Sequence, residues 1–218
     1  MNWYFLTFFG DSMLLLPSGI IVFAILIFSY PSLKQTTQWA LLFGGVGAIV
    51  CASKLAFMGW GIGIRELDFT GFSGHSALSA SIWPVMMWLL TGRFSAAVRK
   101  TAVLSGYALA LLIGYSRLAI HVHSVSEVVS GLVLGFCASS AFLWLQRNVA
   151  PPALSYRKIA AVLLLPIVLI NNGTIAPTQG LLEFIAVSIA PIDKPFTRED
   201  MHANAPVAYN TFNSGSAQ

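Results

Sequence analysis

The chain has 218 residues, of which 56% are hydrophobic and only 9% are charged, and its mean hydropathy is +0.76. A soluble domain usually carries about 25% charged residues. So few charges leave too little polar surface to face water on all sides, which excludes an ordinary soluble domain. The net charge of +4 does not indicate nucleic-acid binding, because the basic residues stand singly between apolar blocks and form no stripe with interleaved aromatic residues.

Long apolar blocks predict membrane-spanning helices, since a helix needs about 20 mostly apolar residues to cross a hydrocarbon core. The blocks show no alternation of apolar and polar residues, which would be typical of a transmembrane barrel. We therefore expect an all-α fold, a polytopic membrane helical bundle with about six transmembrane helices. The first block is expected to be a retained helix and not a cleaved signal peptide. The blocks are 13–30, 39–57, 77–90, 102–115, 128–145 and 159–170.

The chain is predicted to have two parts. Residues 1–173 would form the transmembrane helical domain. Residues 174–218 contain a short apolar stretch, 181–189, which we interpret as an interfacial helix, followed by a polar end that we expect to be flexible.

Basic residues between the blocks predict the topology. Three connections carry most of them, and the positive-inside rule places these connections in the cytoplasm. The opposite face would look outward, which for a bacterial inner membrane means the periplasm. The basic residues of the three connections are Lys34, then Arg93, Arg99 and Lys100, then Arg147, Arg157 and Lys158.

Ser73, Gly74 and His75 stand immediately before the third block. A helix N-terminus offers unpaired N–H groups and the positive end of a dipole, so it binds anions such as phosphate. His75 could exchange a proton near neutral pH. The alternative is a capped helix start with an incidental histidine at the membrane interface.

A second polar segment, residues 115–127, leads into the fifth block. If the helix has begun by His123, then His123 and Glu127 share one helix face, and the carboxylate can orient the imidazole as a nucleophile. Arg117 offers a forked donor suited to phosphate oxygens, although a lone arginine at a membrane end can also simply reach the interface. His121 does not have Glu127 at four residues' distance, and we assign it no catalytic step.

These residues resemble a known family, the membrane branch of the type 2 phosphatidic acid phosphatase superfamily, which shares its active site with vanadium haloperoxidases. The family's third motif, S-R-x-x-x-x-x-H-x-x-x-D, is matched by Ser116, Arg117 and His123, with Glu127 in place of Asp. The resemblance covers roughly residues 54–145.

The other two family motifs precede this one. The second, P-S-G-H, is matched by Ser73, Gly74 and His75, with Phe72 in place of proline. The first, K-x-x-x-x-x-x-R-P, is matched loosely by Lys54 and Arg65, which stand further apart than in the family and are followed by Glu66.

The resemblance implies a metal-independent phosphatase without a cofactor. His123 would attack phosphorus and form a phosphohistidine, Glu127 would stabilise the imidazolium, and His75 would protonate the leaving oxygen and then activate water. The residues implied to bind phosphate are Lys54, Arg65, Ser73, Gly74 and Arg117.

A site at the outer ends of membrane helices suits a lipid phosphate or an isoprenoid pyrophosphate as substrate. Candidates are phosphatidic acid, phosphatidylglycerol phosphate, a polyprenyl pyrophosphate and a lipid A phosphate, with membrane lipids as the surroundings. Two alternatives stay open: a lipid phosphoryl transferase with the same site, and a catalytically degenerate anion-binding membrane protein. A transporter is disfavoured because no internal repeat is visible, and no His or Cys stands near Cys51 or Cys137 at metal-ligand spacing.

Overall fold

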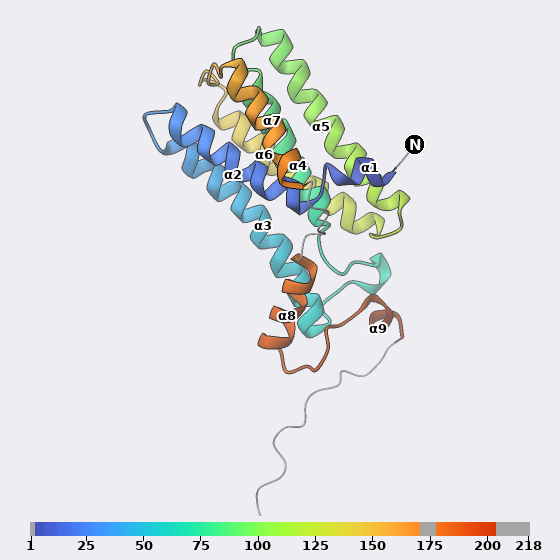
Figure 1. Cartoon of the computed structure of the whole chain (residues 1–218). Helices are drawn as coiled ribbons and strands as arrows, with labels where there is room; N and C mark the ends of the chain where they lie inside the picture. The colour runs from blue at the N-terminus through green and yellow to red at the C-terminus, as the bar shows by residue number, and fades with distance from the viewer. Residues whose placement is uncertain (1–2, 171–177, 204–218) are drawn as a thin grey trace, which may run out of the picture.

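The computed structural model describes residues 3–170 and 178–203. Within these residues the regular structure is helical, apart from one isolated bridge between Ile64 and Phe69 (Figure 1). The α-helices are α1 (Trp3–Phe8), α2 (Ser12–Ser29), α3 (Lys34–Trp60), α4 (Gly74–Leu90), α5 (Ala96–Ala119), α6 (Val125–Leu145), α7 (Tyr156–Ile170), α8 (Thr178–Ile189) and α9 (Arg198–Ala203). A 3-10 turn, η1 (Arg65–Leu67), lies between α3 and α4.

The helices confirm the predicted class but not the predicted number of spans. In the described part of the chain, four stretches are long and apolar enough to cross a membrane: Trp3–Ser29, which joins α1 and α2, and the helices α3, α5 and α6. Helix α4 has 17 residues and α7 has 15. These two match the third and sixth apolar blocks, and they are short for a crossing of about 20 residues. The fold is an all-α membrane bundle with four candidate spans, where about six were expected.

Local sequence signals set where the helices begin and end. Ser73, Ser95 and Ser124 each precede a helix, and each side chain accepts a hydrogen bond from the backbone N–H three residues later. Helix α3 ends at Gly61, whose φ of 67° lies in the left-handed region that glycine adopts readily. These boundaries leave two connections, α3–α4 and α5–α6, at the same end of the bundle.

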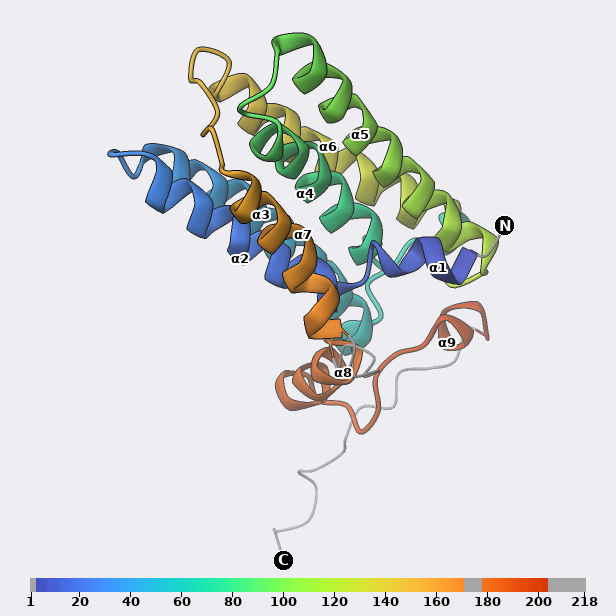
Figure 2. The same ribbon diagram turned by 45° about the horizontal axis from the view of Figure 1, so that its top comes forward.

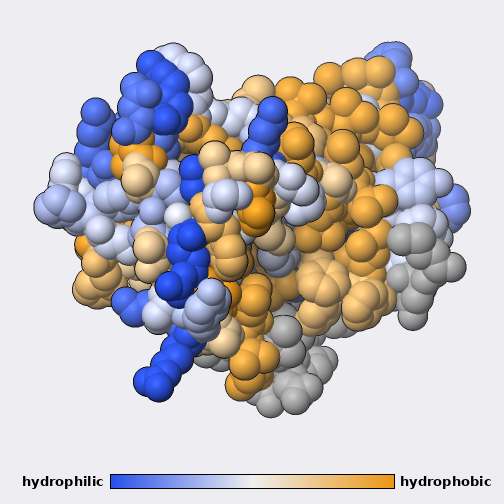
Figure 3. All heavy atoms as spheres, turned by 90° about the horizontal axis from the view of Figure 1, so that it is seen from above, coloured by the Kyte–Doolittle hydropathy of each residue, from blue (hydrophilic) through white to orange (hydrophobic). Residues whose placement is uncertain are grey.

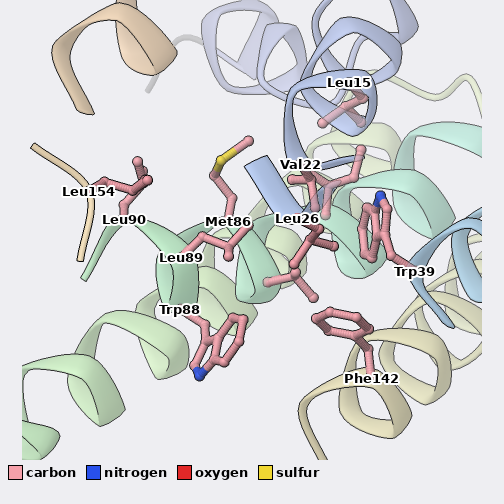
Figure 4. Packing of buried hydrophobic residues seen from close by; sticks show 12 residues of the cluster. Leu15, Val22, Leu26, Trp39, Met86, Trp88, Leu89, Leu90, Phe142 and Leu154 are labelled. Carbon is pink, nitrogen blue, oxygen red and sulfur yellow. The ribbon is translucent and has the colours of Figure 1, made fainter. Parts of the chain in front are cut away.

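Helix α4 lies at the centre of the bundle and packs against α2, α3, α5 and α6. Buried apolar side chains from these helices fill the core around it, among them Leu26, Trp39 and Phe142 (Figure 4). Glycines let α4 and α6 approach closely, because a Cβ at Gly131 would lie 2.8 Å from the Ser73 carbonyl oxygen. This close approach places the start of α4 beside the start of α6.

The connections gather at two opposite ends of the bundle. At one end the Tyr30 hydroxyl donates to the Ala150 carbonyl at 2.8 Å, which joins the α2–α3 and α6–α7 connections. At the other end the Ser126 hydroxyl donates to the Leu67 carbonyl at 2.7 Å, which joins η1 to α6. Helices α8 and α9 lie at this second end in both ribbon views (Figures 1 and 2).

Apolar side chains cover much of the outer surface. Ile20, Phe28, Leu41 and Val133 are examples that are more than half exposed. In a space-filling view, hydrophobic residues form a broad continuous area and hydrophilic residues gather in separate patches (Figure 3). Soluble monomers seldom expose apolar areas of this kind, so the surface suits contact with lipid.

Candidate active site

His123 and Glu127 meet at the start of α6. His123 Nδ1 lies 2.7 Å from Glu127 Oε2, and the glutamate side chain is buried. The condition that the helix has begun by His123 is not met: α6 begins at Val125, because Ser124 caps it and forms a capping box with Glu127. The pair forms nevertheless, since the carboxylate folds back over the helix start, where it also accepts a hydrogen bond from Ser124 N at 3.2 Å.

The second carboxylate oxygen of Glu127 is held from two other segments. Oε1 accepts hydrogen bonds from Thr70 N at 2.9 Å and from Thr70 Oγ1 at 2.5 Å. It also lies 2.8 Å from Arg198 Nη2, in α9. A buried carboxylate is tolerated when it is paired and hydrogen-bonded, so these contacts keep Glu127 ionised and fixed in orientation.

The start of α4 lies against this pair. Ser73 N donates to the Glu127 carbonyl oxygen at 3.1 Å, which joins the two motifs through residues that stand 54 positions apart in the sequence. His75, in the first turn of α4, has its Nε2 at 3.8 Å from Asp11 Oδ2. Asp11 also caps α2 by accepting a hydrogen bond from Met13 N. The N-terminal part of the chain therefore reaches the same site.

Two cations, Arg117 and Lys54, come to this site from α5 and α3. Arg117 Nη1 donates to Thr7 Oγ1 at 3.2 Å, whereas its buried Nε has no hydrogen-bond partner among the described residues. Lys54 is flanked by Gly71, where a Cβ would lie 3.2 Å from Lys54 Cγ. Gly71 has a φ of 145°, which side chains rarely allow, so glycine here lets the α3–α4 connection pass close to the lysine.

A cavity of about 830 Å³ joins these groups. Its polar lining includes Lys54, Gly74, His75, Arg117 and His123. Its apolar lining includes Leu16, Leu78, Leu182 and Phe196. Within residues 3–170 and 178–203, no three His, Cys, Asp or Glu side chains are grouped as metal ligands would be. The cavity thus combines a part that contains two cations and two histidines with an apolar wall.

Several residues singled out in the sequence lie outside the cavity lining, among them Ser116 and Glu127, which is buried behind His123. Arg65 is exposed, and its Nη2 donates to the His202 carbonyl oxygen at 2.9 Å. Ser73 is fully buried, caps α4, and accepts a hydrogen bond from the Ser76 hydroxyl at 3.0 Å. His121 is exposed at the end of α5, with a φ of 55°. The structure therefore does not bring Arg65 or the Ser73 side chain among the groups that line the cavity.

Burial lowers the pKa of His123 from its usual value of 6.5, and the hydrogen bond and charge of Glu127 oppose this effect only in part. The positive charges of Lys54 and Arg117 lower the pKa further. His123 is thus a neutral imidazole at neutral pH. Because Glu127 accepts the proton of Nδ1, the lone pair of the imidazole is on Nε2.

Sequence reasoning missed several residues of this site. Asp11 could have been found, because an acidic residue inside an apolar segment is a functional candidate. Thr70 carries no such signal, and neither does Arg198, which stands singly in the polar end. Its segment, which was expected to be flexible up to residue 218, contributes α9 to the site, while residues 204–218 lie outside the described part.

Comparisons with known proteins agree with the motifs. The family model of the PAP2 superfamily matches residues 62–150. A protein of Klebsiella pneumoniae, named an uncharacterized 22.5 kDa protein in the cps region, is 55% identical over 208 residues, which cover 94% of this chain and 100% of that protein. Phosphatidylglycerophosphatase B of Bacillus subtilis is 32% identical over 74 residues, which cover 33% of this chain and 36% of that protein. No solved structure matches. The matched region contains His75, Arg117, His123 and Glu127, and the chain belongs to the PAP2 superfamily.

Proposed function

We propose that this protein is a membrane phosphatase that hydrolyses a lipid phosphate or pyrophosphate through a phosphohistidine intermediate. The contact between His123 Nδ1 and Glu127 Oε2, at 2.7 Å, carries the proposal. It fixes the tautomer in which Nε2 is the nucleophilic nitrogen, in a residue that lines the cavity. Membership of the PAP2 superfamily, a family of phosphatases, supports the same function.

In the first half-reaction, His123 Nε2 bonds to phosphorus as the bond from phosphorus to the leaving oxygen breaks. Burial, and then the positive charge of Arg117, lower the pKa of His75 to about 3 in the free protein. The negative charge of the bound phosphate, with Asp11 at 3.8 Å from His75 Nε2, would oppose this and favour the protonated ring, which gives its proton to the leaving oxygen. Glu127 stabilises the positive charge that develops on the phosphorylated imidazole.

In the second half-reaction, water attacks phosphorus and the phosphorus–nitrogen bond breaks. His75, now neutral, takes the proton of the attacking water, which restores both histidines and releases phosphate. His75 therefore serves as acid and then as base. Its place at the start of α4, with its ring in the cavity lining, suits both steps.

Charge on the transferred group would be neutralised by Lys54, Arg117 and the backbone N–H groups at the start of α4. The unpartnered Nε of Arg117 supports this, because a buried donor of this kind requires an acceptor. Removal of one oxyanion donor typically lowers the rate by about 10²–10³ where it has been measured. Arg65 would contribute only if it left its contact with His202, and we place it outside the phosphate site.

The substrate is proposed to have its phosphate at headgroup depth and its tail in lipid. The apolar lining that includes Leu16 and Leu182 supports a lipid over a soluble phosphate ester. Phosphatidylglycerol phosphate, phosphatidic acid, a polyprenyl pyrophosphate and a lipid A phosphate all meet this description. The domain would be formed by residues 1–173, with residues 174–218 as an appended segment.

We propose that the site faces the periplasm from the inner membrane. The connections rich in Arg and Lys lie at the end of the bundle opposite to His123. Arg93 in one of them donates to the carbonyl of Leu154 in another at 3.2 Å. By the positive-inside rule that end would be cytoplasmic.

The test is phosphate release from a panel of lipid phosphates and pyrophosphates by protein purified in detergent, with EDTA present. We expect release that persists in EDTA and is lost in His123→Ala, while Arg157→Gln, at the opposite end, serves as a matched control. A stable phosphoenzyme that appears in wild type and not in His123→Ala would identify the intermediate. Turnover that occurs only when a second lipid is present as acceptor would favour the transferase. A folded protein that binds these lipids but releases no phosphate from them would favour the degenerate binding protein.

A further inference from the structure

Arg198 forms an ion pair with Glu127, the carboxylate that orients His123. Its Nη2 lies 2.8 Å from Glu127 Oε1, and its Nη1 donates to the Asp68 carbonyl at 2.9 Å and also pairs with the Asp68 carboxylate. Glu127 is buried, whereas the side chain of Arg198 is about one-third exposed. The guanidinium therefore bridges a buried acid in α6 and a turn that follows η1.

Asp68 anchors this bridge. It ends η1 with a φ of 48°, a left-handed conformation that Asp tolerates better than most residues. Its Oδ1 lies 2.8 Å from His202 Nε2, while its other oxygen pairs with Arg198, so it binds two residues that lie four positions apart on α9. Leu67, the preceding residue, accepts a hydrogen bond from Ser126 of α6. The α9 segment is thus attached to the same turn and helix that hold the site.

The two oxygens of Glu127 have separate partners. Oε2 accepts from His123 and Ser124, and Oε1 accepts from Thr70 and Arg198. The family motif has Asp at this position, and Glu has one more rotatable bond, so more side-chain entropy is lost when it is held in one orientation. A second set of donors on Oε1 offsets this loss and keeps Oε2 on the imidazole.

We propose that Arg198 is a positioning residue of this site, which holds Glu127 so that its other oxygen stays on His123, and that the C-terminal segment thereby completes the active site. The effect on rate rests on the proposed phosphatase function. The effect on the His123–Glu127 pair does not, because it follows from charge and geometry alone.

Arg198 lines the cavity, but both of its terminal nitrogens face carboxylate or carbonyl oxygens. A residue engaged in this way orients Glu127 and does not bind the phosphate. Its replacement should therefore lower kcat and leave KM nearly unchanged, whereas loss of a phosphate-binding cation raises KM.

The charges around His123 predict a second effect. Glu127 is its acidic neighbour, while Lys54 and Arg117 are nearby cations. The hydrogen bond and charge of Glu127 favour protonated His123. In Arg198→Gln the carboxylate loses the donor that holds its other oxygen and would leave the imidazole for part of the time, so the pKa of His123 should fall, by on the order of one unit.

The first measurement is a histidine-ring NMR titration of the full-length protein in detergent, with the His123 signal assigned by its loss in His123→Gln. We expect a lower midpoint in Arg198→Gln, recovery of most of the wild-type value in Arg198→Lys, and no change in Glu199→Gln, an exposed neighbour in α9. If Arg198→Gln does not fold, Asp68→Asn removes the other anchor and should shift the midpoint in the same direction by a smaller amount. An unchanged or raised His123 midpoint in the folded variants would show that Glu127 keeps its place without Arg198 and would overturn the proposal.

The second measurement is steady-state phosphate release. Arg198→Gln should lower kcat by about ten- to a hundredfold, as a small misplacement of a catalytic group does, with KM within about twofold of wild type. A raised KM with unchanged kcat would make Arg198 a phosphate ligand and overturn the proposal. If wild type releases no phosphate from any lipid, the proposed function fails, and the NMR titration still decides the role of Arg198.

Discussion

Asp11 Oδ2 lies 3.8 Å from His75 Nε2, so an acid near the N-terminus faces the histidine that we propose as general acid. The Asp11→Asn variant removes the charge and keeps a side-chain oxygen that can cap α2. Burial lowers the pKa of His75 to about 3 in the free protein, and the negative charges of Asp11 and of bound substrate oppose this lowering. Without the charge of Asp11 we expect the alkaline limb of the kcat–pH profile, which reports the substrate-bound protein, to move to lower pH by on the order of one unit. Phosphate release measured across pH tests this, and an unmoved alkaline limb would contradict it.

The lowered pKa of His123 predicts an acid limit for both activity and stability. Protonated His123 cannot attack phosphorus, so kcat/KM should fall only when the pH falls through a value below 6.5. The folded protein favours the neutral ring, so the contribution to stability is complete above pH 6.5 and is lost as the pH falls through the folded-state pKa. The melting temperature in detergent should therefore fall less on acidification in His123→Gln than in wild type. Equal pH dependence in the two proteins would count against this assignment.

Thr70 donates twice to Glu127 Oε1. Thr70→Val keeps the shape and the backbone N–H but removes the hydroxyl donor, and the loss of a hydrogen bond to a charged group typically costs about 1.5–3 kcal/mol. We expect a lower unfolding free energy and reduced phosphate release, whereas Thr70→Ser, which keeps the hydroxyl, should retain most of both. Equal behaviour of the two variants would show that the hydroxyl contributes nothing.

The close approach of α4 and α6 predicts that Gly131 tolerates no side chain. A Cβ there would lie 2.8 Å from the Ser73 carbonyl oxygen, so Gly131→Ala should destabilise the protein by about 1–3 kcal/mol through overpacking. Gly44→Ala is the matched control, because nothing lies within 4 Å of its Cβ and alanine is favoured in a helix interior by about 0.5–1 kcal/mol. Melting temperatures of the two variants in detergent should move in opposite directions.

The apolar blocks predicted the helices well because burial in lipid demands continuous apolar sequence. The predicted block 39–57 became α3 (Lys34–Trp60), longer at both ends, since polar residues also join a helix once it has formed. The predicted block 128–145 became α6 (Val125–Leu145), which starts earlier because Ser124 caps it. Periodicity and spacing describe the helices but not their caps.

The candidate site was predictable only where its residues fall in short motifs. His75, Arg117, His123 and Glu127 stand at helix ends with fixed spacing, and the structure brings them together. Thr70 and Arg198 come from irregular or short segments, where no period signals which distant residue they will contact. Arg65 was implied as a phosphate ligand by its loose match to the family's first motif, whereas its side chain donates to the His202 carbonyl oxygen in α9.

The pairing of Glu127 with Arg198 sets an order on the biogenesis of the protein. Arg198 follows every helix of the bundle in the sequence, so this contact can form only after α7 and α8 have left the ribosome. A nascent chain that has already inserted α4 and α6 holds His75, His123 and Glu127 but still lacks the guanidinium. The site is therefore finished last, after its surroundings have been placed in the membrane.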